Sequence, residues 1–473
     1  MRVVVCVRPA SDGQIGPFEA SAYEAALRIP DAEVVLLSMA QEKCGEELLR
    51  LTRLGAKEAY HLCDRAFAGA DTLATTYALS RALIKLAPDL VICGRQTMEG
   101  DTAQVGLGLA ARMGYGLVTQ VMAIERVDEK GIACRTRSGE TKQASFPALI
   151  TVERIHTLRL PSIRSRVGSV IRWSAADIGA DVSRCGQKGS PTRVLGSFKN
   201  QSDKRRCHFV APAELESLIA TCRKQEKRTE AVTSESENKL PNVWIVGEAP
   251  CEMAMRISRS VTVVERDTPE SIAARIRAEK PSAVLWDSSP WAKETAATVA
   301  VLLETGLCAD CTVLETDGEH LFMYRPAFAG NIIAKIACDT APAMATVRIG
   351  EENSAEVMFA LGKGAAAYRD ELATFADRYG AELVASRAAV DAELMPYECQ
   401  VGLTGRTVSP RVYVTFGVSG AVHHIAGMKG AGTVIAIDRD KKAPIFDYAD
   451  YGIVCELGEI FGTNEKGNLS IVL

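Results

Sequence analysis

The chain has 473 residues, of which 47% are hydrophobic and 24% are charged, and its formal net charge is -4. This slight acidic excess argues against a general nucleic-acid binder, which needs a basic surface. No apolar run approaches the length of a membrane span, so we expect no stable membrane insertion, and the length predicts about three domains.

The 14 cysteines are scattered and mostly lie in apolar segments, as Cys6 and Cys93 do. Buried, reduced thiols of this kind are typical of the cytoplasm. Met1 and Arg2 lead directly into an apolar strand rather than a signal peptide, which also favours a cytoplasmic protein. Cys308 and Cys311 have the spacing of a metal or redox pair, but no second pair accompanies them. We therefore expect a structural role for this pair and no metal site.

The first part of the chain alternates β-rich runs with helical patterns. The runs cover 2–7, 33–39, 58–63, 89–93 and 148–153, and helical patterns cover 21–28, 42–54 and 72–86. This alternation predicts a mainly parallel sheet with helices on both faces. Ligands then bind beyond the carboxyl ends of the strands, here at 8–10, 38–39 and 94–96.

A polar loop over 96–106 leads into a helix that we expect to continue to Met113. Asp101 or Thr102 is the predicted N-cap, because either side chain accepts hydrogen bonds from the first backbone N–H groups of a helix. The N–H groups beyond the cap could bind a phosphate. A capped surface helix without a ligand explains the same pattern.

The polar, charged composition of residues 197–240 predicts an arm or linker with one short helix over 212–224. A new α/β region then begins with a strand at 243–246, followed by strands at 262–265 and 283–286. We therefore divide the chain into a first domain over 1–196, the arm, a further domain over 241–349 and a last domain over 350–473.

The last domain contains a compact β-turn-α-β pattern. It consists of a strand at 412–416, a glycine turn at 417–420, a short helix at 421–428 and a strand at 433–437. This architecture binds a phosphate at the helix N-terminus, and Asp438 at the end of the second strand could hold a ribose hydroxyl. The two turn glycines alone do not form a full dinucleotide fingerprint.

Ordered motifs extend this pattern through the whole last domain. They lie at 386–391, 402–405, 419–424, 426–429, 443–446 and 449–454. Together they resemble the FAD-binding domain of the alpha subunit of electron-transfer flavoproteins. Segments 305–312, 325–331 and 344–348 resemble the end of that subunit's first domain, in a shortened form.

The first half of the chain resembles the beta subunit of the same family, over roughly residues 1–225. Segments 16–19 with 24–27, 100–106, 158–163 and 189–194 resemble its early nucleotide loop and helix, its nucleotide loop, its partner-recognition loop and the start of its C-terminal arm. The order of the two halves implies a fusion of the two subunits, in which the tether supplies a high local concentration. The resemblance implies three mainly parallel, doubly wound α/β domains, adenine-nucleotide hydrolase-like in the first two and Rossmann-like in the last.

The resemblance also implies that the last domain binds FAD and carries electrons. Arg387 would lie over the flavin ring as a cation, Thr404 would bond near N5 and His424 would sit near the C2 oxygen. Main-chain donors of 419–424 would hold the ribityl chain and phosphate, and Asp438 and Asp450 would face the adenosine or ribityl end. The implied FAD residues are Lys363, Ser386, Arg387, Val401, Gly402, Leu403, Thr404, Gly405, Ser419, Gly420, Ala421, Val422, His423, His424, Asp438, Asp450 and Tyr451.

Simpler interpretations of these residues stay open. Arg387 could pair with Asp391 one helical turn away, and Thr404 could cap a turn. The adjacent His423 and His424 should point in different directions from a short helix, so at most one should reach the flavin.

Four of the implied residues depart from the family pattern. Leu403 and His423 stand where the family usually has Gln, Asp438 replaces Asn, and Lys363 replaces Arg. Lysine is a point charge that cannot reproduce a bidentate guanidinium, and Leu403 cannot bond the cofactor through its side chain. These departures bear on FAD affinity and potential.

The beta-like half should bind an adenine nucleotide, which is structural AMP in many family members. The sequence of residues 100–106 is more similar to that of family members that carry a second FAD and bifurcate electrons from NADH. The implied residues of this second site are Val7, Ser38, Gly100, Asp101, Thr102, Ala103, Gln104 and Val105.

We expect an electron carrier rather than a conventional enzyme, because the chain shows no acid–base constellation of the kind that a dehydrogenase needs. The expected partners are a flavin-dependent dehydrogenase of acyl-CoA type, docking at Leu160, and a downstream electron acceptor. A non-redox adenine-nucleotide-binding protein of the same fold is the alternative from another class.

Overall fold

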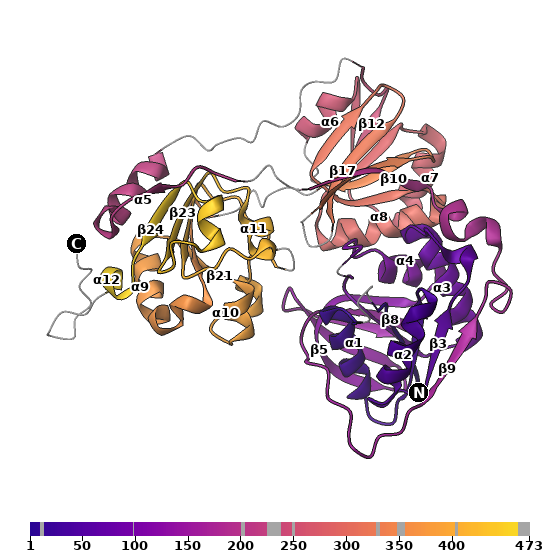
Figure 1. Ribbon diagram of the computed structural model, residues 1–473. Coiled ribbons are helices and arrows are strands. Elements are labelled where there is room, and N and C mark those ends of the chain that lie inside the picture. The colour runs from indigo at the N-terminus through magenta and orange to yellow at the C-terminus, as the bar shows by residue number, and fades with distance from the viewer. Residues whose placement is uncertain are drawn as a thin grey trace. The chain divides into compact units, whose positions relative to one another are not determined.

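The computed structural model describes residues 1–9, 14–97, 99–199, 204–224, 238–247, 251–327, 332–347, 355–402 and 405–461. The chain forms two compact units (Figure 1). The first unit contains residues 1–197 together with most of 238–347, and the second contains 204–224 and 355–461. The first two predicted domains thus share one unit and the arm belongs with the last, while the boundaries drawn from the sequence stay predictions.

A nine-stranded sheet forms the base of the first unit, in the order β7-β6-β5-β8-β4-β1-β2-β3-β9. The strands are β1 (Arg2–Cys6), β2 (Glu33–Met39), β3 (Glu58–Leu62), β4 (Leu90–Gly94), β5 (Gly116–Asp128), β6 (Gly131–Thr136), β7 (Thr141–Ser145), β8 (Ala148–Val152) and β9 (Ser169–Trp173). Neighbouring strands pair in parallel except at the β5-β6 and β6-β7 pairings. All five predicted strands of this region are confirmed, and β5 to β7 extend the sheet beyond them.

Helices cover both faces of this sheet. Residues Val3 and Val5 of β1 pack in one core with α1 (Pro17–Leu27) and α2 (Gly45–Thr52). Val4 faces the opposite core, which contains α3 (Thr72–Leu86) and α4 (Val105–Met113). This alternation follows from the two-residue period of a strand, and burial on both faces explains the continuous apolar run of β1.

The rest of the first unit contains two smaller sheets. One is parallel, in the order β13 (Val261–Val264), β12 (Val243–Val246), β14 (Ala283–Trp286), β19 (Ala343–Val347) and β15 (Leu307–Cys311), with helices α6 (Cys251–Ile257), α7 (Pro269–Glu279) and α8 (Pro290–Leu303). The other has the order β10 (Thr192–Lys199), β18 (Ile332–Cys338), β17 (Leu321–Ala327) and β16 (Val313–Thr316). Strand β10 from the first half of the chain therefore completes a sheet built by the second half.

A six-stranded parallel sheet forms the second unit, in the order β11-β24-β23-β22-β20-β21. The strands are β11 (His208–Phe209), β20 (Val357–Leu361), β21 (Glu382–Ala385), β22 (Val412–Phe416), β23 (Thr433–Asp438) and β24 (Tyr451–Val454). Its helices are α5 (Leu215–Lys224), α9 (Arg369–Tyr379), α10 (Arg387–Asp391), α11 (Val422–Met428) and α12 (Gly458–Phe461).

The predicted helix of the arm is confirmed as α5, and it is an integral part of the second unit (Figure 1). Leu215, Ile219 and Cys222 are buried in one core with strands β20 and β22. Strand β11 pairs with β24 at the sheet edge.

The mainly parallel α/β fold class predicted from the sequence is confirmed. Among the described residues, no helix combines the length and apolar composition needed to cross a membrane.

Candidate functional site

A cavity of about 680 Å³ lies at the carboxyl edge of the sheet in the second unit. Residues that directly follow each of the five strands β20 to β24 line it, namely Lys363 and Gly364, Ser386 to Ala388, Gly417 to Ser419, Asp438 and Arg439, and Cys455 to Leu457. The carboxyl ends of parallel strands are where α/β sheets bind ligands.

The turn from β22 to α11 depends on glycine. Gly417 and Gly420 have φ angles of 61° and 87°, in the left-handed region that other residues rarely adopt. A Cβ atom at Gly420 would also lie 2.2 Å from the backbone nitrogen of Ile445. The sharp turn brings Ser419 and Ala421 to the cavity wall at the start of α11.

Charged side chains of both signs line this cavity. Lys363, Arg387 and Arg439 are the cations, and they suit the phosphates of a dinucleotide. Asp438 is placed at the end of β23, where a carboxylate can accept from ribose hydroxyls. Arg387 begins α10, whose N-cap Ser386 accepts a hydrogen bond from the N–H of Ala389 at 3.3 Å.

Arg387 also forms the alternative pair expected from its spacing. Its Nε lies 3.4 Å from Oδ2 of Asp391, and both residues line the cavity. The two interpretations are therefore compatible, because an exposed pair of this kind is weak enough to rearrange around a ligand.

His424 is buried and neutral. Its Nδ1 lies 3.2 Å from the carbonyl oxygen of Val401, which can only accept, so Nδ1 carries the proton. Its Nε2 then accepts from the hydroxyl of Tyr413 at 3.1 Å. Burial lowers the pKa of His424 to about 4, which outweighs the opposite effect of the Val401 bond. His424 thus reaches the cavity wall, but as an uncharged ring with both nitrogens bonded to the protein.

A second cavity, of about 740 Å³, lies in the first unit. The carboxyl ends of β1, β2 and β4 form one wall through Val7, Leu37 and Gly94, and the loop over 100–106 forms another. Cys308 of β15 and Arg325 of β17 contribute from the second half of the chain.

Arg325 fixes the loop that precedes α4. Its Nη1 and Nη2 each donate to a carbonyl oxygen at 2.8 Å, that of Gly100 and that of Asp101. Asp101 and Ala103 have φ angles of 51° and 53°, which are incompatible with a helix.

The predicted N-cap at Asp101 or Thr102 is therefore wrong. Helix α4 begins at Val105, with Gln104 as its N-cap. The Asp101 carboxylate instead accepts a hydrogen bond from Nε2 of Gln96.

Two buried polar atoms without partners belong to residues of this second cavity. Within the described part of the chain, Nε of Arg325, Nε2 of Gln104 and Oγ of Ser38 have no hydrogen-bond partner. Arg325 and Gln104 line the cavity, whereas Ser38 does not, because its side chain in β2 points to the opposite face from those of Leu37 and Met39. Buried polar groups are nearly always satisfied, so the orphaned atoms of Arg325 and Gln104 indicate a polar ligand.

Comparison with known proteins gives consistent results for the two halves. The profile of the family described as Electron transfer flavoprotein domain matches residues 3–178 and 261–373, and that of the Electron transfer flavoprotein FAD-binding domain matches 353–429. The chain belongs to the electron transfer flavoprotein family. The first profile therefore matches two separate stretches of the chain, and the FAD-binding profile matches a stretch that begins within the second of them.

Relatives of this flavoprotein match parts of the chain. Protein FixA of Azorhizobium caulinodans is 35% identical over 271 residues, which cover 49% of this chain and 96% of FixA. Electron transfer flavoprotein subunit alpha of Thermoanaerobacterium thermosaccharolyticum is 34% identical over 237 residues, covering 40% of this chain and 72% of the relative. Electron transfer flavoprotein subunit beta of Megasphaera elsdenii is 36% identical over 211 residues, covering 41% and 78%. The predicted fusion of a beta-like and an alpha-like half is confirmed, as is an FAD-binding domain with a role in electron transfer.

The flavoprotein's fold brings about half of the sequence-predicted FAD residues to one cavity. Those that line it are Lys363, Ser386, Arg387, Ser419, Ala421, His423, His424 and Asp438. Val401, Gly402, Gly405, Gly420 and Val422 shape the adjoining turns without lining it, and Leu403 and Thr404 lie outside the described residues.

Asp450 and Tyr451 lie elsewhere in the domain. They stand at the amino end of β24, the opposite edge of the sheet. The Asp450 carboxylate accepts from Nη1 of Arg205 at 2.5 Å and from the N–H of Val434 at 2.8 Å, so these two bonds link it to the arm and to β23.

In the first unit, most residues predicted for the second nucleotide meet at the second cavity. Val7, Gly100, Thr102, Ala103, Gln104 and Val105 line it, whereas Asp101 and Ser38 do not. The sequence did not single out Arg325, which lines this cavity, or Arg439 and Glu456, which line the cavity of the second unit. Arg325 interrupts an otherwise apolar run, which is the one signal that could have singled it out.

Proposed function

We propose that this flavoprotein shuttles electrons through FAD held in the cavity of the second unit. The observation that carries the proposal is the convergence of five strand ends on one cavity lined by Lys363, Arg387 and Arg439. We further propose that the donor is a flavin-dependent dehydrogenase of acyl-CoA type, and that a downstream acceptor takes the electrons on.

Bound FAD supplies the redox chemistry, and the chain supplies binding and electrostatics. Arg387 and Lys363 would place positive charge in the cavity, which favours the reduced, more negative cofactor. Lys363 does so as a point charge, without the fork of the Arg that the family usually has. His424 is neutral, so in this proposal it orders Val401 and Tyr413 and adds no charge.

We propose an adenine nucleotide as the ligand of the cavity in the first unit. The orphaned Nε of Arg325 and Nε2 of Gln104 support a polar ligand there. Structural AMP is the simpler choice, and it would make the chain a carrier with one redox centre.

A bifurcating flavoprotein with a second FAD, oxidising NADH, is the second candidate, and the space available favours it. The cavity of about 740 Å³ adjoins another of about 360 Å³, and the two share Arg8, Met39 and Thr75 in their walls. Together they provide more room than a mononucleotide fills, slightly beyond the upper end of the usual range for ligand pockets.

The loop over 158–163 is the proposed docking element for the dehydrogenase. Leu160 and Ile163 are 89% and 101% exposed, although side chains of this type are normally buried. We expect Leu160→Ala to slow reduction by the dehydrogenase while leaving FAD content unchanged. Equal loss of flavin would argue against a docking role.

The test of the cofactor proposal is the visible spectrum of the purified chain, followed by heat release and chromatography of its nucleotides. One FAD with one AMP supports the simple carrier. Two FAD without AMP support the bifurcating candidate. A colourless protein that FAD cannot reconstitute would overturn both, in favour of a non-redox nucleotide-binding protein.

A further inference from the structure

The segment that carries Leu160 is tied to the body of the first unit at both ends. At its start, the Ser21 hydroxyl of α1 accepts from the N–H groups of Ile155 at 3.0 Å and His156 at 3.1 Å, and donates to the carbonyl of Glu153 at 2.7 Å. At its end, the N–H of Gly168 donates to Oγ1 of Thr52, the last residue of α2, at 2.9 Å.

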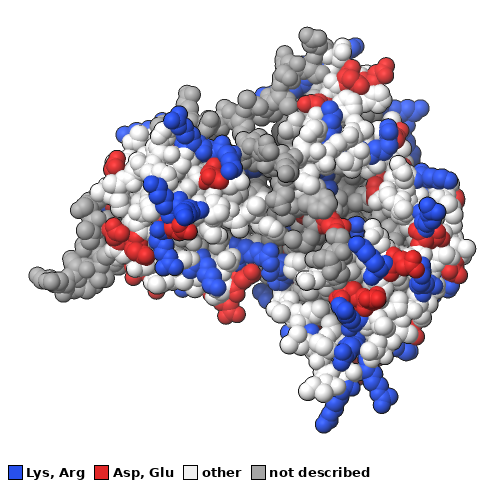
Figure 2. Space-filling model, viewed as in Figure 1, with Lys and Arg blue, Asp and Glu red and all other residues white. Residues whose placement is uncertain are grey.

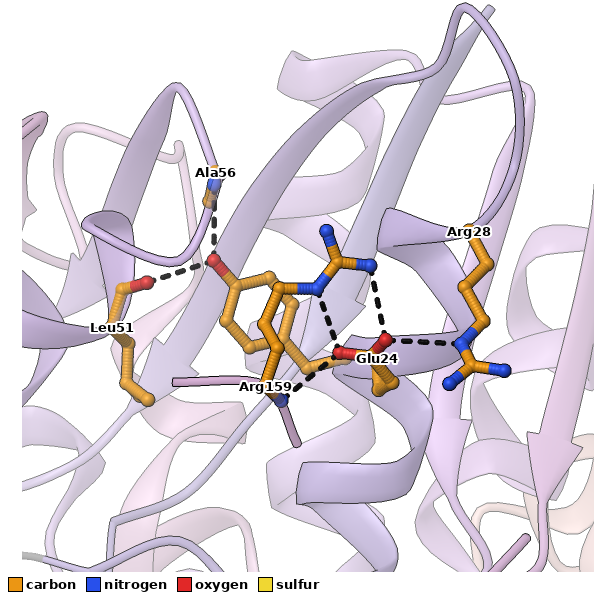
Figure 3. A network of polar contacts seen from close by, with 6 residues as sticks. Glu24, Arg28, Leu51, Ala56 and Arg159 are labelled. Carbon is orange, nitrogen blue, oxygen red and sulfur yellow. Dashed lines mark hydrogen bonds and ion pairs between the residues drawn. The ribbon is translucent and has the colours of Figure 1, made fainter. Parts of the chain in front are cut away.

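A third attachment lies directly beside Leu160 (Figure 3). The Arg159 guanidinium donates from Nε to Oε2 of Glu24 at 2.9 Å and from Nη2 to Oε1 at 3.0 Å. The backbone N–H of Arg159 donates to the same Oε2 at 3.2 Å. One carboxylate on α1 thus holds both the side chain and the main chain of Arg159, while Arg28 approaches Oε1 from the other side at 3.0 Å.

The Glu24 carboxylate is charged under all physiological conditions. Its side chain is only 4% exposed, and burial alone would raise its pKa. The hydrogen bonds from Arg159 and then Arg28 more than offset this effect and lower the pKa of Glu24 to about 2. A bidentate pair with a sheltered carboxylate is stronger than a single-bonded pair on the open surface, even though the Arg159 side chain is 43% exposed.

Between Arg159 and Gly168, the hydrogen bonds that the structure describes stay within the loop. The hydrogen bonds within 160–167 are local, from the N–H of Arg164 to Oγ of Ser162 and from Ser165 to the carbonyl of Ser162. Leu160, Ile163 and Val167 are 89%, 101% and 51% exposed. Arg164 and Arg166 lie between Ile163 and Val167, and neither forms an ion pair with any residue that the structure describes.

We propose that the Glu24–Arg159 pair is a clamp that positions the loop over 160–167, and that this loop fits an apolar pocket bordered by carboxylates on the partner dehydrogenase. The inference rests on the docking role in the proposed function and adds the residues that hold the loop and the chemistry of its partner. Three exposed apolar side chains, with two arginines between the second and the third, are complementary to such an acidic-rimmed pocket.

The clamp lowers the conformational entropy that the loop loses when it binds the dehydrogenase. Leu160 is bonded to Arg159, so fixing the Arg159 backbone fixes the point from which Leu160 projects. A loop that is already ordered loses less conformational freedom on binding, and the benefit appears as affinity for the partner. Glu24 and Arg159 are therefore positioning residues, without contact to any redox centre.

The experiment uses the full chain, loaded with its flavin, with a purified acyl-CoA dehydrogenase and its acyl-CoA substrate as electron source. We expect Glu24→Gln and Arg159→Gln each to raise the KM for the flavoprotein by about tenfold, with kcat and FAD content unchanged. Arg159→Lys should recover part of the loss, because it restores the charge but not the fork. Arg28→Gln is the matched control, since Arg28 binds the same carboxylate but not the loop; it should change KM less than about twofold.

Two further readouts separate the possible failures. Amide hydrogen exchange across 157–167 should accelerate in the Glu24 and Arg159 variants without any partner present, and unchanged exchange would overturn the clamp. If Leu160→Ala leaves KM unchanged, the docking role in the proposed function is overturned. If Leu160→Ala raises KM but the clamp variants do not, only the present inference is overturned.

The charge of the partner is tested by salt. The KM of the unmodified chain should rise with ionic strength, and Arg164→Gln with Arg166→Gln should remove most of that dependence. A KM that does not depend on salt would overturn the acidic rim.

Discussion

At the scale of the residue, His424 makes the stability of the second unit depend on pH. Its usual pKa of 6.5 applies in the unfolded chain, whereas burial lowers the pKa to about 4 in the fold. The unfolded state therefore binds more protons between these two values, and acid favours unfolding. Stability is unaffected by this group above pH 6.5, and up to about 3 kcal/mol is lost as the pH falls toward 4.

We expect His424→Asn to flatten this dependence, because Asn can still donate to the carbonyl of Val401 but does not titrate. The measurement is urea unfolding of the second unit at several pH values between 7 and 5, comparing slopes rather than absolute stabilities. His208→Asn, an exposed histidine of the same unit, should keep the slope of the unmodified chain. Identical slopes in all three proteins would show that His424 is not the titrating group.

Single residues also mark where reasoning from the sequence alone was incomplete. The choice of Asp101 or Thr102 as N-cap followed from local preference, which Arg325 overrides by bonding the carbonyls of Gly100 and Asp101 from 225 residues away. No local pattern encodes that contact. Asp450 gives a similar case, since its partner Arg205 lies in an arm that looks like a plain linker.

At the scale of the element, α5 shows that the arm is structural. Ile219 is fully buried among the side chains of the second unit. We expect Ile219→Ala to destabilise that unit by about 2–5 kcal/mol, through lost burial and the cavity left behind. The effect is measured by chemical unfolding, with the release of FAD as the signal. Lys224→Ala, on the exposed face of the same helix, is the control. If both variants unfold alike, α5 is only loosely attached.

Elements with strong periodicity were predictable, and those that depend on distant pairing were not. Strands β1 to β4 and helix α3 lie where the apolar pattern placed them. Strand β11 has only two residues, too few for any pattern, and exists because β24 offers it an edge. The cavity of the second unit was predictable from motifs at strand ends. Arg439 and Glu456 belong to no such motif, and only the fold brings them to the cavity wall.

At the scale of the whole molecule, two units with separate cores should respond to ligands separately. We expect calorimetry of the ligand-free chain to show two unfolding transitions. FAD should shift one transition to higher temperature and AMP the other. Each ligand should add about 2.7 kcal/mol to the free energy of unfolding of its unit when it is present at a hundredfold excess over its Kd. A single transition that moves with either ligand would mean that the units unfold as one.

Strand β10 carries a consequence for how the polypeptide is made. It leaves the ribosome long before its partner β18 has been synthesised, because β18 belongs to the other half of the chain. In the interval, Val194 and Leu195, which stay 67% and 47% exposed even in the finished fold, stand on an unpaired edge. Such edges attract other chains, and distant pairings form slowly. Newly made protein should therefore be most prone to aggregate while translation is passing between these two strands, which makes this interval the natural point for a chaperone to act.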